Sequence, residues 1–204
     1  MNSDPKQRIL DRLTLKSSGF ARSSVAASNR VEIGDPIQFA NNAAVNECRV
    51  LQASSLDSAL ATLAELALQE KWPTPIGVAP SLQPHWPQTT LSADFGSNHG
   101  EKYACISQAY AGLEDTGSLV LLSSPQSPTL LNFLSTFHVV LLARKRILKN
   151  KSALWPLLRQ EIPHMPRSIN IITGPSRTAD IEQTIQLGAH GPKYLTVVLY
   201  DDHS

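Results

Sequence analysis

The sequence has few of the residues that would connect it with metal clusters, membranes or nucleic acid. Only two of its 204 residues are cysteines, whereas an iron–sulfur cluster generally needs four thiolates. Lysine and arginine (18) nearly balance aspartate and glutamate (17), and a net charge of +1 is not typical of proteins that bind nucleic acid or membrane surfaces. No apolar run reaches the roughly 18 residues that a membrane-spanning helix needs. We therefore expect no cofactor in this chain, no nucleic acid and no membrane.

The sequence also shows neither the histidine spacing of a metal site nor the apolar segment of a signal peptide. The six histidines are scattered, with no pair at the spacing that binds a metal on one helix face, so a metal site is not expected. Cys48 and Cys105 are too far apart for a redox motif, and buried thiols are the simpler interpretation. The first residues, MNSDPKQRILDRL, carry charges throughout and lack an apolar signal segment, which predicts a cytoplasmic protein.

The residues that are present predict a soluble α/β fold. Hydrophobic residues make up 42% of the chain, enough for one domain with its own core. Apolar runs without alternation, such as FHVVLLA at 137–143, are typical of strands inside a parallel sheet. We expect a mainly parallel sheet flanked by helices, with residues 1–46 as a helical or irregular arm and residues 47–204 as one domain. The expected strands are 49–53, 76–79, 119–122, 137–143, 168–173 and 194–200, and the expected helices are 4–16, 55–70, 152–160 and one that begins near 176.

The most informative stretch is GPSRTADIEQTIQLGAHGPK, residues 174–193, which lies between two expected strands. A strand, a Gly-Pro turn, a helix and a second strand would form a βαβ unit. Gly174 lets the backbone bend, and Ser176 or Thr178 can cap the helix. Free amides at that helix N-terminus, with Arg177 beside them, would hold a carboxylate or a phosphate.

A second interpretation of the same stretch needs no ligand. Asp180 and Glu182 fall in the first turn of the expected helix, where their charges would satisfy its dipole. Arg177 would then only pair with one of these two carboxylates. The spacing of the residues leaves both interpretations open.

A second turn, residues 114–118, carries two adjacent carboxylates, Glu114 and Asp115, followed by Thr116, Gly117 and Ser118. Two acids held close together repel, which raises the pKa of at least one and suits a base or a nucleophile. Asp, Thr and Gly are also the residues that a tight hairpin turn requires, and the spacing alone favours that simpler role.

Two further groups also leave alternatives open. The proline-rich and aromatic tract that contains Trp72, His85 and Trp86 either lines a pocket or packs under a loop. The basic run Arg144, Lys145 and Arg146 is either a solvated face or a docking site for an acidic partner.

Both turns resemble one family. The string GPSRTADIE, followed by a Gly-x-His-Gly-Pro turn, is similar to the C-terminal signature of the lactate-utilisation protein C family, also called the LUD domain. The turn at 114–119 is similar to the family's Ala-Glu-Thr-Gly-Ser/Thr-Leu turn, with Asp115 in place of the usual glutamate. The resemblance covers residues 91–201 well and the first half loosely.

The resemblance implies a fold, a process and a site. The fold would be the one shared by CoA transferases, ribose-5-phosphate isomerase and glucosamine-6-phosphate deaminase (the NagB/RpiA/CoA transferase-like fold). The process would be oxidation of L-lactate to pyruvate, with iron–sulfur partner proteins carrying the electrons. Together with the turn chemistry it gives Asp115 and Glu114 as catalytic candidates, and a ligand-binding set of Thr116, Gly117, Gly174, Ser176, Arg177, Thr178 and His190.

Two alternatives belong to other classes of protein. One is a free-standing enzyme that transfers acyl-CoA or isomerises a sugar phosphate. The other is a binding or scaffold module without chemistry of its own.

Overall fold

The computed structural model describes residues 30–96, 102–179, 185–187 and 191–202. Its main sheet has six strands, and every neighbouring pair in it is parallel. In sheet order these strands are β1 (Arg49–Ala53), β12 (Tyr194–Tyr200), β7 (Ser135–Ala143), β4 (Lys102–Gln108), β2 (Ile76–Val78) and β3 (Ala93–Asp94). The predicted parallel sheet is confirmed, and the apolar run at 137–143 is one of its central strands.

A second sheet has four strands in the order β8, β5, β6, β9. Their bounds are β8 (Ile147–Leu148), β5 (Ala111–Leu113), β6 (Ser118–Leu122) and β9 (Ile169–Ile172). Strands β5 and β6 form the predicted antiparallel hairpin, with Leu113 opposite Ser118 across the turn. Strand β9 runs antiparallel to β6, so it belongs to this sheet and not to the parallel one.

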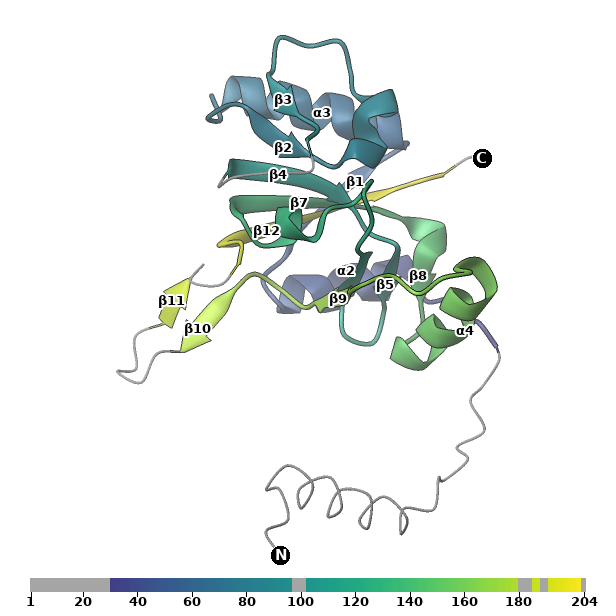
Figure 1. Ribbon diagram of the computed structural model, residues 1–204. Helices are drawn as coiled ribbons and strands as arrows, with labels where there is room; N and C mark the ends of the chain where they lie inside the picture. Colours follow the sequence, from purple (N-terminus) through teal and green to yellow (C-terminus); the bar gives the residue numbers. More distant parts are fainter. Residues whose placement is uncertain (1–29, 97–101, 180–184, 188–190, 203–204) are drawn as a thin grey trace, which may run out of the picture.

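Helices cover both sheets. They are α2 (Pro36–Val45), α3 (Leu56–Gln69) and α4 (Lys151–Glu161), with short 3-10 segments η1 (Pro80–His85), η2 (Thr129–Asn132) and η3 (Arg144–Arg146). The side chains of Asp35, Ser55 and Asn150 cap the three α-helices by accepting a bond from a first-turn amide. Figure 1 shows α3 above the main sheet, α2 and the second sheet below it, and α4 at the edge of the second sheet.

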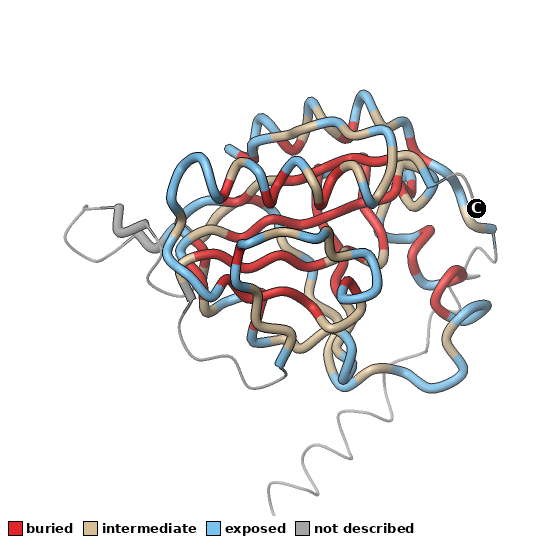
Figure 2. The backbone as a smooth tube through the Cα atoms, turned by 90° about the horizontal axis from the view of Figure 1, so that it is seen from above, coloured by how far each residue is buried: buried red, intermediate tan, exposed pale blue. Residues whose placement is uncertain are grey.

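The layers bury three apolar clusters. One lies between α3, η1 and the upper face of the main sheet, and a second lies between the lower face, α2 and β6. The third joins the second sheet to α4 through Leu154, Leu157 and Leu158. Figure 2 shows the central strands buried along their length and the helices buried on one side only. Strand β7 contributes Val139 and Leu141 to the first cluster, and Val140 and Leu142 to the second.

Part of the predicted N-terminal arm packs into this core. Residues 36–45 form α2, and its Phe39 and Ala43 have no exposed surface. Both belong to the cluster beneath the main sheet. The folded body therefore begins before residue 47, while the helix expected at 4–16 lies outside the described residues.

The helix expected after Ser176 is wrong. The chain instead forms a hairpin of two short antiparallel strands, β10 (Arg177–Ala179) and β11 (Ile185–Leu187), with Arg177 opposite Leu187. Thr178 and Ile185 are β-branched, which favours strands. The predicted βαβ unit is therefore also wrong, because β9 and β12 lie in different sheets and no helix is described between them.

Candidate functional site

The two turns chosen from the sequence do lie together. The hydroxyl groups of Ser118 and Thr173 are hydrogen-bonded at 2.6 Å, because the start of β6 lies opposite the end of β9. The C-terminal end of α2 joins the same cluster: Asn42 donates to the carbonyl of Glu114 at 2.6 Å, and Asn46 to that of Thr116 at 3.0 Å.

These turns do not lie where ligands are usual in this class of fold. Open α/β sheets usually bind ligands at the carboxyl ends of their parallel strands. Asn46 and Glu47 lie within three residues of the start of β1, and Arg177 is paired with Glu47, so the cluster lies at the amino end of that strand. The antiparallel course of β9 places its end at this opposite edge.

The side chain of Glu114 links the turn to Lys149 and to the backbone at Asp35. Its side chain is 7% exposed, forms an ion pair with Lys149 and accepts a 2.7 Å bond from the amide of Asp35. The hydrogen bond from Lys149, followed by that from Asp35, holds the pKa of Glu114 below its usual value. Repulsion from Asp115 is therefore not the dominant influence on this carboxyl group. An ionised carboxylate with its oxygens already engaged is a weak base, and this geometry favours a structural role.

The rest of this turn is shaped for packing. Asp115 is exposed, its carboxylate accepts a 3.2 Å bond from Thr116, and it lines neither of the two cavities described below. Gly117 has φ +62°, and a Cβ there would lie 2.2 Å from the backbone nitrogen of Ala43 in α2. Gly117 therefore allows the hairpin to approach α2.

The turn at 174–178 has fewer free groups than the sequence suggested. Gly174 has φ +78°, and a Cβ there would lie 2.5 Å from the carbonyl oxygen of Asn46. The amide of Ser176 donates to Pro192 at 2.8 Å. Arg177 is 46% exposed and paired with Glu47, which is 60% exposed. The side chain of Thr178 and the whole of His190, Asp180 and Glu182 lie outside the described residues.

Beside this turn lies an apolar hollow of about 270 Å³, which we call the amino-edge cavity. Three aromatic rings line it: Phe137 is stacked between Trp72 (centroids 6.0 Å apart, planes at 28°) and Tyr194 (4.5 Å, 22°). Its other lining residues are Glu47, Arg49, Leu51, Leu63, Leu66, Glu70, Val139, Pro175, Lys193, Leu195 and Thr196. The interpretation of Trp72 as a pocket residue therefore holds, whereas His85 and Trp86 are absent from this lining.

Two carboxylates, Glu47 and Glu70, and two cations, Arg49 and Lys193, line this cavity. Glu47 is paired with Arg177, and Glu70 accepts a 2.8 Å bond from the indole of Trp72. Within the described part of the chain, Arg49 and Lys193 have no carboxylate partner, although Lys193 lies 5.4 Å from the ring centroid of Tyr194. Arg49, Lys193 and the neighbouring Arg177 outnumber Glu47 and Glu70 by one charge, which favours an anionic group at the cavity.

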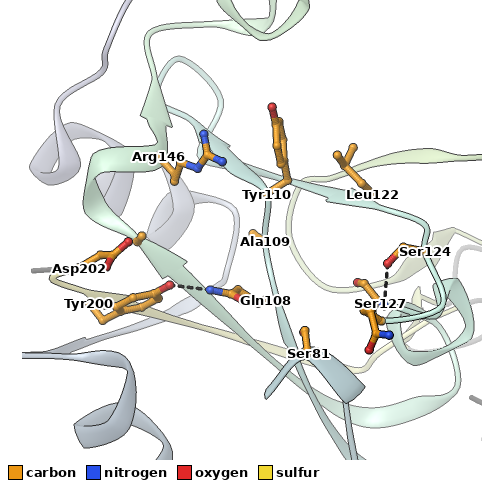
Figure 3. A pocket seen from close by; sticks show the side chains of 12 residues that line it. Ser81, Gln108, Ala109, Tyr110, Leu122, Ser124, Ser127, Arg146, Tyr200 and Asp202 are labelled. Carbon is orange, nitrogen blue, oxygen red and sulfur yellow. Dashed lines mark hydrogen bonds between the residues drawn. The ribbon is translucent and has the colours of Figure 1, made fainter. Parts of the chain in front are cut away.

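A second hollow, the carboxyl-edge cleft, lies at the opposite edge of the main sheet (Figure 3). It has a volume of about 390 Å³ and is lined from the ends of β4, β7 and β12. Its lining residues are Ser81, Gln108, Ala109, Tyr110, Leu122, Ser124, Gln126, Ser127, Ala143, Arg146, Tyr200 and Asp202. An adjoining hollow of about 480 Å³ shares four of these residues and extends the cleft toward Asp57 and His85.

Hydrogen bonds already connect the polar groups of this cleft. Gln108 donates to the hydroxyl of Tyr200 at 2.6 Å, as Figure 3 shows. Arg146 makes two bonds to Glu161, at 2.7 and 2.8 Å, and lies 4.9 Å from the ring centroid of Tyr110. The bond from Arg146 is the largest influence that lowers the pKa of Glu161, and burial is the largest that raises that of Tyr110.

The neighbouring basic run is also neutralised. Arg144 is paired with Asp201 at 2.8 Å, and Lys145 with Asp202 at 2.7 Å. These pairs contradict a free docking patch for an acidic partner, and the cleft suits an uncharged hydroxyl or amide ligand. Sequence reasoning missed Gln108 and Tyr200, because only the strand order brings the ends of β4 and β12 together.

Metal ligands and a membrane-spanning helix are not found among the described residues. None of the described helices combines the length and apolarity that a membrane crossing needs. No three described His, Cys, Asp or Glu side chains lie close enough to hold a metal ion. His138 is buried, with its Nε2 2.7 Å from the hydroxyl of Ser107 and its Nδ1 without a hydrogen-bond partner among the residues described. Burial lowers the pKa of His138 to about 4, which keeps the ring neutral.

Known proteins match this chain in sequence and in fold. Residues 98–200, just over half of the chain, match the model of the LUD domain. "Lactate utilization protein C" of Anoxybacillus flavithermus is 34% identical over 90 residues, which cover 44% of this chain and 40% of that protein. The chain thus aligns with less than half of that relative.

Two further matches cover more of the chain at lower sequence identity. The Escherichia coli protein YkgG is 27% identical over 181 residues, which cover 81% of this chain and 78% of that protein. A crystal structure of a DUF162 family protein from Deinococcus radiodurans has a TM-score of 0.56 at 15% identity, and the match covers 80% of this chain and 94% of that one. That structure supports the fold alone. From the domain match, this chain belongs to the LUD domain family.

Proposed function

We propose that this chain is a subunit of an L-lactate utilisation system, in which iron–sulfur partner proteins carry the electrons of lactate oxidation. We further propose that it binds a small anionic ligand at the amino-edge cavity, beside the turn 174–178. Relatives named for lactate utilisation support the process. With two cysteines, this chain has too few thiolates for a typical cluster of its own, which supports the need for partners.

One observation supports the anionic ligand above the others: an apolar cavity carries two cations, Arg49 and Lys193, that have no carboxylate partner in the described structure. An anion there gains attraction without first breaking an ion pair. At the turn itself, an anion would have to displace Glu47 from Arg177. The ligand would therefore contact Arg49 and Lys193 first, and Arg177 only after Glu47 has moved.

The binding part is tested by calorimetric titration of the purified chain with L-lactate, pyruvate and acetate. Arg49→Ala/Lys193→Ala removes the two cations, Arg177→Ala tests the turn, and Arg159→Ala on α4 is the matched control, because Arg159 is also exposed. We expect the double variant to weaken or abolish anion binding and the control to leave it unchanged. Equal binding by the double variant and the wild type would refute this location.

The process is tested in cells that express the chain natively. Deletion should stop growth on L-lactate, the wild-type gene should restore it, and the Arg49→Ala/Lys193→Ala gene should restore it poorly. The tagged chain should also co-purify with proteins that contain iron–sulfur clusters. Normal growth of the deletion strain on L-lactate would rule out this function.

The carboxyl-edge cleft favours one alternative, a free-standing enzyme, because folds of this kind usually bind ligands at that edge. Such an enzyme would act through Gln108 and Tyr200, since Asp115 lines neither cavity. It predicts turnover by the isolated chain on acyl-CoA or sugar-phosphate substrates, reduced by Tyr200→Phe. If the isolated chain has no turnover and no ligand binds, the scaffold interpretation replaces both.

A further inference from the structure

The aromatic wall of the amino-edge cavity narrows the class of ligand. Phe137 and Tyr194 stack with their planes 22° apart, and Trp72 continues the stack on the other side of Phe137. Tyr194 leaves 45% of its surface exposed although it lines the cavity. A planar ring gains most from such a wall, because offset stacking adds attraction beyond the burial of apolar area.

A small hydroxy acid does not match these walls. The other inner side chains are aliphatic, among them Leu51, Leu63 and Val139. Burial of a hydroxyl group without a hydrogen-bond partner is unfavourable. A three-carbon acid would also leave much of the 270 Å³ unfilled. L-lactate therefore fits the charge of this cavity but not its walls.

The cations select a negative charge on that ring. Arg49 and Lys193 lie on the same cavity as the stack, and Lys193 is already 5.4 Å from the ring centroid of Tyr194. Glu47 is paired with Arg177, whereas Glu70 accepts a bond from the neutral indole of Trp72 and keeps its charge, so three cations face two carboxylates here. An acid group on a bound ring can thus meet two cations while the ring stays against the aromatic wall.

We infer that the amino-edge cavity binds a planar aromatic anion, with its ring against Tyr194, the exposed end of the stack, and its acid group at Arg49 and Lys193. This inference rests on the proposed anionic site, and adds that the ligand is aromatic. The physiological ligand would then be an aromatic effector or cofactor-like acid that binds more tightly than L-lactate or pyruvate.

The test compares three probes by calorimetry: 2-naphthoate, its uncharged analogue 2-naphthamide, and acetate. Quenching of tryptophan fluorescence gives a second readout, because Trp72 lines the cavity. We expect 2-naphthoate to bind at least tenfold more tightly than acetate and several-fold more tightly than 2-naphthamide.

Two variants separate the ring from the charge. Tyr194→Leu should weaken 2-naphthoate roughly 2- to 10-fold, which corresponds to one aromatic contact. Arg49→Ala/Lys193→Ala should weaken it by a similar factor and leave 2-naphthamide unchanged, since exposed charges each contribute little. Arg159→Ala is the control. Because Arg49 and Lys193 are exposed, the double variant is expected to fold even if Tyr194→Leu does not.

The outcomes distinguish this inference from the proposed function. If acetate or lactate binds through Arg49 and Lys193 but 2-naphthoate binds no more tightly, the anionic site stands and the aromatic class is wrong. If 2-naphthamide binds as well as 2-naphthoate and the double variant has no effect, both the anionic site and this inference fail.

Discussion

Replacement of Gly117 by alanine tests whether the turn at 114–118 is built for packing. Gly117 has φ +62°, and its Cβ would lie 2.2, 2.5 and 2.6 Å from backbone atoms of Asn42 and Ala43. The left-handed conformation costs a non-glycine residue about 1–2 kcal/mol. A collision with helix backbone adds an overpacking cost of about 1–3 kcal/mol, because no flexible side chain can move aside. Together these give a loss of roughly 2–5 kcal/mol.

The measurement is thermal unfolding followed by circular dichroism. For a chain of this length, a loss of this size corresponds to a fall in Tm of roughly 5–15 °C. Gly191→Ala is the control, because the nearest described atoms to its Cβ belong to side chains and not to backbone, with Ser176 at 3.2 Å and Phe133 at 3.9 Å. An unchanged Tm for Gly117→Ala would refute the packing role, and loss of ligand binding without loss of stability would restore the predicted binding role of Gly117.

Three further variants test the fold and its ionisable groups by chemical denaturation. Phe39→Ala should lower the free energy of unfolding by about 3–5 kcal/mol, because Phe39 is fully buried. Ile37→Ala on the same helix is the control, and because Ile37 is 73% exposed it should change this free energy by less than about 0.5 kcal/mol. Similar values for the two variants would place α2 outside the core. Because Lys149 lowers the pKa of Glu114, the ionised carboxylate stabilises the fold above pH 4.5, and this stabilisation is lost as the pH falls further. Glu114→Gln should therefore make the free energy of unfolding depend less on pH at the acid end. An unchanged dependence on pH would contradict the ion pair with Lys149. Burial lowers the pKa of His138 from 6.5 in the unfolded chain to about 4 in the folded one, so the free energy of unfolding should fall by about 3 kcal/mol between pH 6.5 and 4. His138→Gln should remove this dependence on pH if the ring is buried and neutral.

Local patterns were sufficient to predict most elements of the body. The apolar runs at 49–53, 137–143 and 194–200 are strands of the parallel sheet, because each is bounded by polar or turn residues. The helix after Ser55 begins where its cap and its apolar spacing indicate. The hairpin at 111–122 follows from its turn residues.

Long-range pairing was not predictable from these patterns. Residues 169–172 form an apolar strand whichever sheet they join, and only their antiparallel pairing with β6 places the turn at Gly174 on the amino edge. Residues 177–187 have too short an apolar stripe to separate a helix from a hairpin. The strings of the family signature were recognisable, but the roles expected for Glu114 and Arg177 depended on partners, Lys149 and Glu47, that lie far away in the sequence.

The order of strands has a consequence for how the chain is made. Strand β12 (Tyr194–Tyr200) lies between β1 and β7, yet it is synthesised after both. Until it leaves the ribosome, these two strands present unpaired edges and apolar faces, which invite association with other chains. The main sheet can therefore close only after nearly all of the domain has emerged, and nascent chains of this protein are expected to depend on chaperones during that interval.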